Sequence, residues 1–484
     1  MNDGFQEVVS SISALTSIKM AQQIPRIAVV GGGIAGTLCS MVLKNRGLAP
    51  VLIDQATGRG NHQDTSTGGL GGRLRGPGAQ FLRATDPRLQ SVMAMLQNAN
   101  VIQPWTGRFG MLGSKSGGFL PANVITSGVG SRSGGGVAGL APADPVAASN
   151  DTTATSAAAT DAGDFCHFVQ YSDNTAYVGV PTMLDLCPQI ATLADIATMG
   201  GTRVLGASMA AEGGWILDLD EKKDSSIEAG NTQVAQHFDA MVLATHDPSL
   251  ASTIVQSIVD AEVKAGGYSS VDEAIETASS AGESDTFPLL LGRLRSLSRH
   301  LQQVRDEGRM PLYSVQFTYP PGFSNTIPFD AVSVPGSPFL QFLAREASKP
   351  GRSRDGGDVW TAISTSQLAA HVMSSESMSA EEKESHIQHV LTSELANLVS
   401  PYFGGDEAKV PAPTEVQVKR WGAALVGKGL ELQEDSITLA GWRLGICGDF
   451  IRQSNAYPTP WEAAALSGLE AGERMTNILV QQEL

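Results

Sequence analysis

A glycine-rich turn near the start of the sequence has the residue types that bind phosphate groups. Gly31-Gly32-Gly33-Ile34-Ala35-Gly36 follows a β-branched run at 26–30 and precedes an apolar pattern with helical spacing. This order predicts a strand, a tight turn and a helix. Gly31 would permit the turn, Gly33 would let the backbone approach a pyrophosphate, and Gly36 would let the helix pack closely on the strand. The N–H groups at the start of that helix would then face the anion.

A carboxylate follows the next predicted strand, Val51-Leu52-Ile53. At this position Asp54 could accept hydrogen bonds from the 2′- and 3′-hydroxyls of a ribose. Strand, glycine turn, helix and terminal acid together favour a dinucleotide site over a glycine-rich loop that binds nothing. Because Asp54 would repel a 2′-phosphate, NADP is the weaker choice in this site, whereas NAD and FAD both remain.

A second glycine-rich segment, residues 68–74, carries a cation. Gly72 and Arg73 come after the second predicted strand, where they could reach back over a bound pyrophosphate. Gly78 and Ala79 are small enough to let the backbone press against a flat ring, and the amide of Gln80 could contact the edge of that ring. The same composition is also typical of a flexible surface loop.

The C-terminal part of the chain repeats the arrangement of strand, glycine, acid and helix. Residues 442–447 predict a strand, Gly448-Asp449 its end, and residues 460–475 a helix. The N–H groups at the start of this helix would face an electron-rich ligand edge, and Asp449 could hydrogen-bond a hydroxylated linker. The alternative interpretation is an ordinary buried strand and helix.

Composition argues against several classes of function. The chain has 33 Lys and Arg against 49 Asp and Glu, a formal net charge of −16, which would repel phosphate backbones and anionic lipid surfaces. Nucleic acid is therefore not an expected partner. The four cysteines lie far apart without a C-x-x-C pair, so the sequence encodes neither a dense disulfide framework nor a zinc site. A reducing, cytoplasmic location is expected.

No membrane span is expected from the one long uncharged stretch, residues 27–43, because three glycines interrupt it and it is shorter than a bilayer requires. The first 25 residues lack a basic start and a continuous apolar segment, so they do not predict a secretory signal. Organellar targeting by this segment stays open.

Composition also divides the chain. Residues 112–164 are rich in small and polar residues and predict a disordered surface insertion. Residues 221–236 predict a polar loop between two strands, and residues 250–309 predict helices. Ser379 and Glu382 form a capping-box pattern that predicts the start of a further helix.

The chain resembles the flavin-dependent amine oxidase superfamily and is similar to its renalase-like branch. The resemblance spans residues 26–473 apart from the insertion. Two of its segments, Lys419–Trp421 and Gln453–Asn455, point to the renalase-like branch. The segments that carry it are Ile27–Gly36, Asp54, Gly71–Arg73, Gly78–Phe81, Tyr177–Pro181, Phe238–Thr245, Gly448–Asp449, Lys419–Trp421 and Gln453–Asn455.

This resemblance implies an α/β, two-domain FAD-binding Rossmann-type fold, para-hydroxybenzoate-hydroxylase-like, with a mixed α+β substrate domain. The implied FAD-binding domain comprises residues 26–85, 181–250 and 436–484, after an extension at 1–25. The implied substrate domain comprises residues 86–180, which include the insertion, and 251–435. FAD would be noncovalent, since no cysteine follows Asp449. The implied cofactor-binding residues are Gly31, Gly33, Ile34, Ala35, Gly36, Asp54, Gly72, Arg73, Gly78, Ala79, Gln80, Val204, Gly448 and Asp449.

The implied reaction is oxidation of isomeric dihydronicotinamides, 2- or 6-dihydroNAD(P), to NAD(P)+, with O2 as the acceptor and H2O2 released. A flat pocket that orients the two rings would suffice, so no catalytic residue is assigned. The candidates for the pocket walls are Gln80, Phe81, Trp421, Tyr457 and Trp461. His246 is interpreted as a turn residue, and no metal-binding pattern is present.

Two other functions remain alternatives at this point. Many amine oxidases place a lysine near the flavin on a strand of the substrate domain, but this sequence has none between Lys264 and Lys349. That gap weakens the first alternative, an oxidase of a small amine or polyamine. The second alternative is a flavin-binding scaffold without turnover.

Overall fold

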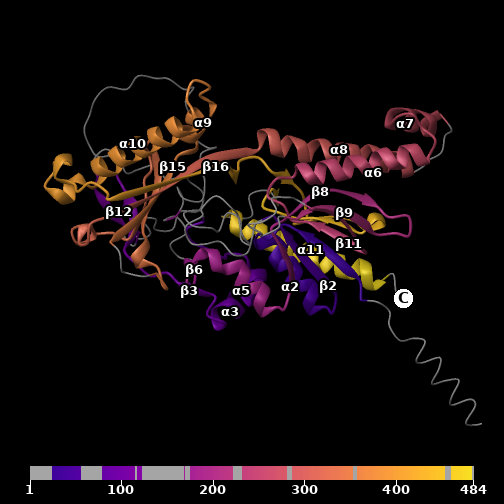
Figure 1. Cartoon of the computed structure of the whole chain (residues 1–484), viewed down its shortest axis with the longest axis horizontal. Helices are drawn as coiled ribbons and strands as arrows, with labels where there is room; N and C mark the ends of the chain where they lie inside the picture. Colours follow the sequence, from indigo (N-terminus) through magenta and orange to yellow (C-terminus); the bar gives the residue numbers. More distant parts are fainter. Residues whose placement is uncertain are drawn as a thin grey trace, which may run out of the picture.

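The structure is a computed structural model that describes residues 24–55, 79–114, 117–122, 168, 175–221, 232–280, 286–352, 357–452 and 459–481. Two large sheets with helices around them make up most of these residues (Figure 1). None of the described helices is long and apolar enough to cross a membrane.

A six-stranded sheet contains the predicted strand-turn-helix unit. Its strand order is β18-β19-β11-β1-β2-β7, and all neighbours are parallel except β18 and β19. The strands are β1 (Arg26–Val30), β2 (Ala49–Asp54), β7 (Ala197–Gly200), β11 (Ala240–Leu243), β18 (Ile437–Leu439) and β19 (Leu444–Ile446). Both faces of β1 are buried, because Ile27 and Val29 pack in one core and Ala28 and Val30 in another. The continuous apolar runs in the sequence reflect this burial on both faces.

Helices cover one face of this sheet and a small antiparallel sheet covers the other. On the first face lie α2 (Ile34–Asn45), α5 (Leu186–Leu193) and α11 (Pro460–Gln481), while α3 (Gln90–Asn98) joins the same core. On the second face lies the sheet of β8 (Thr202–Met209), β9 (Trp215–Glu221) and β10 (Thr232–Phe238).

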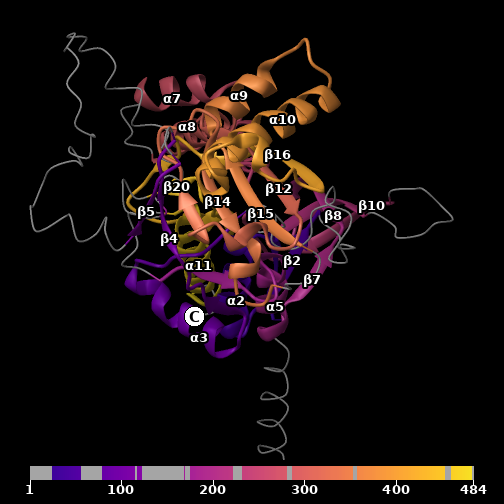
Figure 2. The same ribbon diagram turned by 90° about the vertical axis from the view of Figure 1, so that its left-hand side faces the viewer.

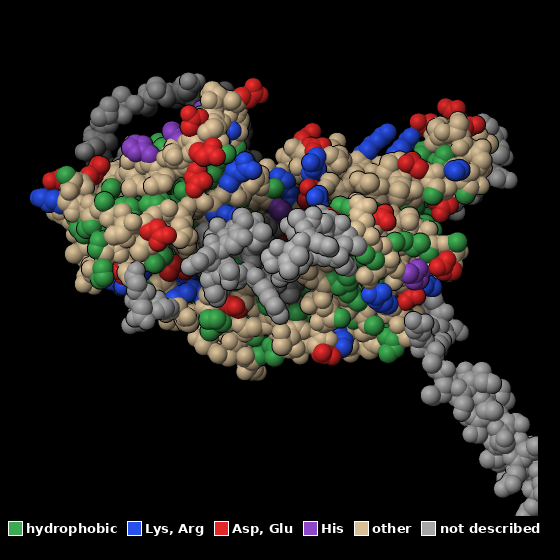
Figure 3. All heavy atoms as spheres, viewed as in Figure 1, with side chains coloured by type: hydrophobic (Ala, Val, Ile, Leu, Met, Phe, Trp, Pro, Cys, Tyr) green, Lys and Arg blue, Asp and Glu red, His purple; other side chains and the backbone are tan. Residues whose placement is uncertain are grey.

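A helical arm extends this second core away from the sheets. It consists of α6 (Ser249–Ala265), α7 (Val271–Ser280) and α8 (Thr286–Glu307), with α7 at its tip (Figure 1). Arg295 of α8 donates to both carboxylate oxygens of Asp272 on α7, at 2.9 and 2.7 Å, and so holds the tip to the arm. On the face shown in Figure 3, acidic and basic side chains are interspersed along the arm.

A seven-stranded sheet forms the other half of the molecule, in the order β16-β12-β15-β14-β13-β4-β5. Helices α9 (Ser366–Ser374) and α10 (Ala380–Val399) cover its outer face (Figure 2). The strands are β4 (Phe109–Leu112), β5 (Phe119–Pro121), β12 (Arg309–Tyr319), β13 (Ala331–Ser333), β14 (Leu340–Arg345), β15 (Asp358–Ser364) and β16 (Glu415–Val426). Two further pairs join β3 (Ile102–Pro104) to β6 (Tyr177–Gly179) and β17 (Leu430–Glu431) to β20 (Ile451–Arg452).

The inner face of the seven-stranded sheet shares a core with the six-stranded sheet. Neighbouring residues of β12 show this, since Tyr313 and Val315 belong to the core under α9 and α10, whereas Leu312 belongs to the core that contains α2 and α11. Phe342 and Ile363 belong to the same shared core. A site between the two halves is therefore lined by both sheets.

Two sequence predictions about local structure are wrong. The segment 221–236, predicted as a polar loop, includes the start of β10, which pairs antiparallel with β9. The predicted insertion at 112–164 begins too early, because Phe119–Pro121 is strand β5 and pairs with β4. Most of the remaining insertion, like the first 23 residues, lies outside the described residues.

The predicted capping box at the start of α10 is confirmed. The backbone N–H of Glu382 donates to the Ser379 hydroxyl at 3.2 Å, and the N–H of Ser379 donates to the Glu382 carboxylate at 2.7 Å.

Helices α2 and α11 pack backbone to backbone. A Cβ atom added at Gly468 would lie 2.8 Å from the Cα of Ala35, and one added at Gly472 would lie 2.8 Å from the Cβ of Val42. Real Cβ atoms do not approach that closely. Because the residues of α11 meet those of α2 in the same chain order, the two helices run in the same direction.

We predict that Gly468→Ala destabilises the protein by about 2 kcal/mol or more, because the helices must separate to admit the methyl group. In an exposed helix the same change would stabilise by up to ~1 kcal/mol, so the sign of the effect is informative. Urea denaturation measures the change in the free energy of unfolding. Gly441→Ala is the control, since a Cβ atom there meets nothing within 4 Å. Equal stability of the two variants would contradict the close packing.

Candidate functional site

The glycine turn lies at the edge of the six-stranded sheet where the parallel strands reach their carboxyl ends. Gly31 has a φ of +115°, a conformation that side chains disfavour. Its N–H donates to the carbonyl of Ile53 at 2.8 Å, and the N–H of Gly32 donates to the carboxylate of Asp54 at 3.0 Å. The turn and the acid at the end of β2 are therefore held together by the backbone.

Three of the four glycines of the turn, Gly31, Gly33 and Gly36, differ in their surroundings. A Cβ atom at Gly31 would overlap the carbonyl of Ala244, and one at Gly36 would overlap the carbonyl of Gly31. A Cβ atom at Gly33 would meet nothing within 4 Å. Gly31 and Gly36 are thus required by the fold itself, whereas Gly33 borders open space at the helix start.

The start of α2 has the features of an anion-binding helix end. Gly33 is its N-cap and offers no side-chain hydrogen bond, and the first turn contains no acidic residue. The first N–H groups of a helix, here those from Ile34 onward, have no acceptor within the helix. With the helix dipole they favour a negative charge at this position.

The first two turns of α11 extend past this helix end. Gly468 contacts Ala35 in the first turn of α2, and Pro460 precedes Gly468 by eight residues, or about 12 Å of helix. The N–H of Gly448 donates to the Ser467 hydroxyl at 2.9 Å, which fixes the end of β19 against this part of α11. A ligand that starts at the N-terminus of α2 and extends along α11 would reach the start of α11. We call this path the crevice.

Trp461, in the first turn of α11, carries a buried donor without a protein partner. Its side chain is 6% exposed, and its indole N–H has no hydrogen-bond acceptor among the described residues. Leaving such a group unpaired costs about 1–3 kcal/mol, so it indicates an acceptor that the described residues do not supply.

Glu462, the next residue, anchors the segment that carries Gln80. Its fully buried carboxylate accepts from the backbone N–H groups of Thr85 and Asp86, both at 2.6 Å. This contact ties residues 79–86 to the start of α11. The backbone five residues after Gln80 is therefore held at the start of α11 by a carboxylate that the sequence analysis did not identify.

Asp449 is buried and lies beside two basic side chains. Its carboxylate is 3.5 Å from Nη1 of Arg309 and 3.9 Å from Nδ1 of His246, and Arg309 also donates to the carbonyl of His246. The sequence analysis treated His246 as a turn residue and did not consider Arg309. No local pattern could identify these neighbours, because His246 follows β11, Arg309 begins β12 and Asp449 follows β19, and these positions are remote in sequence.

The candidate wall residues meet in the shared core. Ala79, Phe81, Trp421 and Trp461 all belong to it, together with Ile34 and Ala35 of the glycine turn. The ring of Phe81 lies 4.9 Å from that of Phe168 and 6.0 Å from that of Phe342. The indole N–H of Trp421 donates to the Ser314 hydroxyl at 2.7 Å, so its ring orientation is fixed.

Some predicted site residues lie elsewhere or cannot be placed. Val204 is on β8 and packs with Val51 and Ile53 on the opposite face of the parallel sheet from α2. Its predicted contact with adenine, through the backbone, stays a prediction. Four predicted residues lie outside the described part of the chain: Gly72, Arg73, Gly78 and Tyr457.

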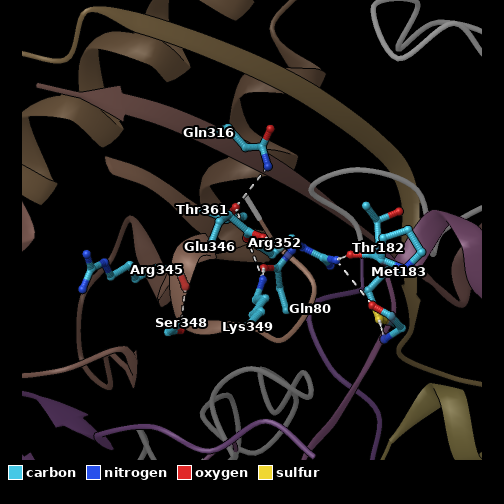
Figure 4. Close-up of polar contacts among 12 residues, drawn as sticks. Gln80, Thr182, Met183, Gln316, Arg345, Glu346, Ser348, Lys349, Arg352 and Thr361 are labelled. Carbon is cyan, nitrogen blue, oxygen red and sulfur yellow. Dashed lines mark hydrogen bonds and ion pairs between the residues drawn. The ribbon is translucent and has the colours of Figure 1, made fainter. Parts of the chain in front are cut away.

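A buried lysine reaches Gln80 from the half of the molecule that contains the seven-stranded sheet. Lys349 follows β14, is 3% exposed and donates to Oε1 of Gln80 at 2.7 Å (Figure 4). The sequence argument against an amine oxidase relied on a lysine-free interval that ends at this residue. Because Lys349 itself lies at the predicted ring-binding segment, that argument no longer separates the two functions.

Among the described residues no group of His, Cys, Asp or Glu could hold a metal ion.

Comparison with solved structures identifies the fold. One match is a candidate protoporphyrinogen oxidase from Exiguobacterium sp. 255-15, with a TM-score of 0.51 and 11% identity over 96% of this chain and 100% of that one. Another is an oxidoreductase from Methanosarcina mazei, with a TM-score of 0.50 and 9% identity over 93% of this chain and 100% of that one. No family model matches the sequence, and no curated protein does. The predicted fold class, an α/β Rossmann-type fold with a second, mixed α+β part, is confirmed.

We predict that Cys39, Cys187 and Cys447 do not react with Ellman's reagent at pH 8 in the folded protein. Burial raises the pKa of Cys187 and Cys447 to about 12 and raises that of Cys39 as well. Because their pKa is raised by folding, the folded state favours these thiols in their protonated form. The resulting contribution to the free energy of unfolding is complete below about pH 8.5, the pKa of an unfolded thiol, and falls as the pH rises toward 12. Cys166 is replaced by Ser for the assay, and guanidinium should then release three equivalents. Reaction before unfolding would contradict the burial.

Proposed function

We propose that the chain is an FAD-dependent oxidase that holds its cofactor noncovalently between the two sheets. The observation that carries this is the position of α11, whose first turn lies about 12 Å beyond the glycine turn and presents the unpaired Trp461 N–H. That is the span between a pyrophosphate and an extended ring system. Bound FAD would supply a hydride acceptor and the reaction with O2.

The residues along the crevice fit the parts of this cofactor in order. Asp54 would accept from the ribose hydroxyls, the N–H groups at the start of α2 would hold the pyrophosphate, and Asp449 would accept from the ribityl hydroxyls. Trp461 and Gln80 would donate to the polar edge of the ring. No cysteine follows Asp449, and Cys447, two residues before it, is fully buried. Both facts support noncovalent attachment.

We propose a reduced nicotinamide isomer, 2- or 6-dihydroNAD(P), as the substrate. A hydride leaves the dihydropyridine, which becomes aromatic NAD(P)+, and O2 takes up the two electrons with a further proton to give H2O2. The aromatisation supplies much of the driving force, so the protein needs to orient the ring rather than to remove a proton with a strong base. Phe81, Trp421 and Trp461 would provide flat walls for this purpose.

Oxidation of a small amine is the second candidate. The observation that favours it is Lys349, a buried basic group at the ring-binding segment where the sequence analysis expected none. A dihydronicotinamide and an amine both deliver a hydride, and the same crevice could take either.

Anaerobic titration separates these candidates. We expect the flavin absorbance of the purified protein to bleach stoichiometrically with borohydride-reduced NAD isomers, and air to restore it with one H2O2 per NAD+ formed. NADH is the control for the position of the hydride, and putrescine and simple primary amines test the second candidate. Bleaching by amines alone would transfer the proposal to amine oxidation. A fully loaded flavin that no compound reduces would indicate a scaffold, and protein that binds no FAD would refute the proposal.

We predict that Trp461→Phe weakens FAD binding at least tenfold and lowers the stability of the protein free of FAD only through the buried contact volume that it removes. The change removes a donor that has no protein acceptor, so the unliganded fold loses only contact volume, whereas the complex loses a hydrogen bond. Equilibrium dialysis and thermal denaturation with and without FAD measure the two effects.

Trp215→Phe is the matched control for this variant. Trp215 is 1% exposed, and its indole N–H donates to the carbonyl of Trp442 at 2.8 Å. The control should be less stable than Trp461→Phe by about 1–3 kcal/mol and should keep the affinity for FAD. Unchanged affinity in Trp461→Phe would show that its indole does not contact the cofactor.

A further inference from the structure

Five buried or half-buried polar side chains form one cluster at the junction of the two halves (Figure 4). We call it the Lys349 cluster; it comprises Gln80, Glu346, Lys349, Arg352 and Thr361. Lys349 donates to Oε1 of Gln80 at 2.7 Å and to Oε1 of Glu346 at 2.6 Å. The hydroxyl of Thr361 donates to the same Glu346 oxygen at 2.7 Å, and Nε of Arg352 lies 3.5 Å from the other.

The cluster connects three segments that are remote in sequence. Gln80 belongs to the ring-binding segment, and Glu346 and Lys349 follow β14 of the seven-stranded sheet. Arg352 donates to the carbonyl groups of Gly179 and Pro181, at the end of β6. The Lys349 side chain has one further contact that fixes it, because the indole of Trp105 lies 5.3 Å from its ammonium group.

The pKa values of both members of the central pair lie below their usual range. Burial lowers the pKa of Lys349, and the Glu346 carboxylate opposes that shift. Burial alone would raise the pKa of Glu346, but Lys349, Arg352 and Thr361 outweigh it and hold this pKa below its usual range. A buried ion pair adds little net stability compared with an apolar pair of the same volume. Its presence beside a candidate ring site therefore calls for another role.

The chemistry of the partners fixes the orientation of the Gln80 amide. An ammonium group has three donors and no acceptor, so only the carbonyl oxygen of Gln80 can face Lys349. The amide nitrogen, which can only donate, then lies at the opposite corner of the side chain. Gln80 is 2% exposed and stands between Ala79 and Phe81, both of which pack in the shared core.

We propose that Lys349 is a positioning residue that makes Gln80 a hydrogen-bond donor to the cofactor ring. The inference rests on the proposed function, because it requires a ring at this segment. With the carbonyl held by Lys349, the amide N–H groups are directed to an acceptor on the ring edge. A donor there stabilises the reduced ring, which carries more electron density, relative to the oxidised ring.

The test compares three variants in the FAD-loaded protein. Lys349→Met removes the group that orients the amide, and Gln80→Glu keeps the contact with Lys349 but replaces the N–H donors with an acceptor. Both should lower the flavin midpoint potential by about 30 mV or more, a tenfold change in the two-electron equilibrium, and shift the flavin absorbance bands. Lys349→Arg retains a donor and should restore most of the difference.

Two controls keep the result decisive. Lys349→Met leaves Glu346 near Arg352 and Thr361, but it breaks a buried pair, so Lys349→Met/Glu346→Gln is measured alongside it. Thermal denaturation without FAD reports any purely structural role. Loss of stability with an unchanged potential and spectrum, in both Gln80→Glu and the double variant, would overturn the inference. Failure of the wild-type protein to bind FAD would instead refute the proposed function.

Discussion

The close contact between α2 and α11 determines how the rest of the crevice is assembled. These helices come from opposite ends of the chain, and only glycine at 468 and 472 lets their backbones approach so closely. The contact aligns α11 so that its first two turns extend past the glycine turn. Glu462 in this extension then binds the N–H groups of Thr85 and Asp86 and so places the segment of Gln80. One steric constraint therefore positions the glycine turn, the start of α11 and the segment of Gln80 relative to one another.

Buried charges complete the arrangement that the helices begin. Lys349 and Glu346 connect the seven-stranded sheet to Gln80, and Arg309 connects the base of the helical arm to Asp449. Such pairs contribute little to net stability, but breaking one leaves an uncompensated buried charge that costs about 3–5 kcal/mol. They therefore penalise alternative placements of the two halves more than they stabilise the observed one. The relative position of the sheets is specified electrostatically at the points where a ligand would contact both.

Features encoded by neighbouring residues could be predicted from the sequence, whereas features that depend on distant partners could not. The strand, glycine turn and helix at 26–45 and the capping box at Ser379 depend on short-range patterns, and both are confirmed. Strand β10 was missed because its residues are mostly exposed or half-buried and polar, so no apolar alternation marks it. Lys349 was missed because its role depends on Gln80, far away in the chain. A search for a lysine on a strand could not find it, since it lies in a connection after β14.

The order of donors and acceptors along the crevice gives the strongest argument for the kind of ligand that it takes. Asp54, at one end, is an acceptor suited to hydroxyl groups, and the start of α2 offers N–H donors suited to an anion. At the other end Trp461 offers a buried donor within an apolar, aromatic environment. A ligand that satisfies all three must carry hydroxyls, then phosphate, then a flat ring with acceptors on its edge. FAD meets this order with the ring buried, as a resident cofactor requires. A nicotinamide dinucleotide that exchanges with solvent in each turnover has less need of a buried donor in an apolar, aromatic core. This favours flavin as the resident group and nicotinamide as the substrate.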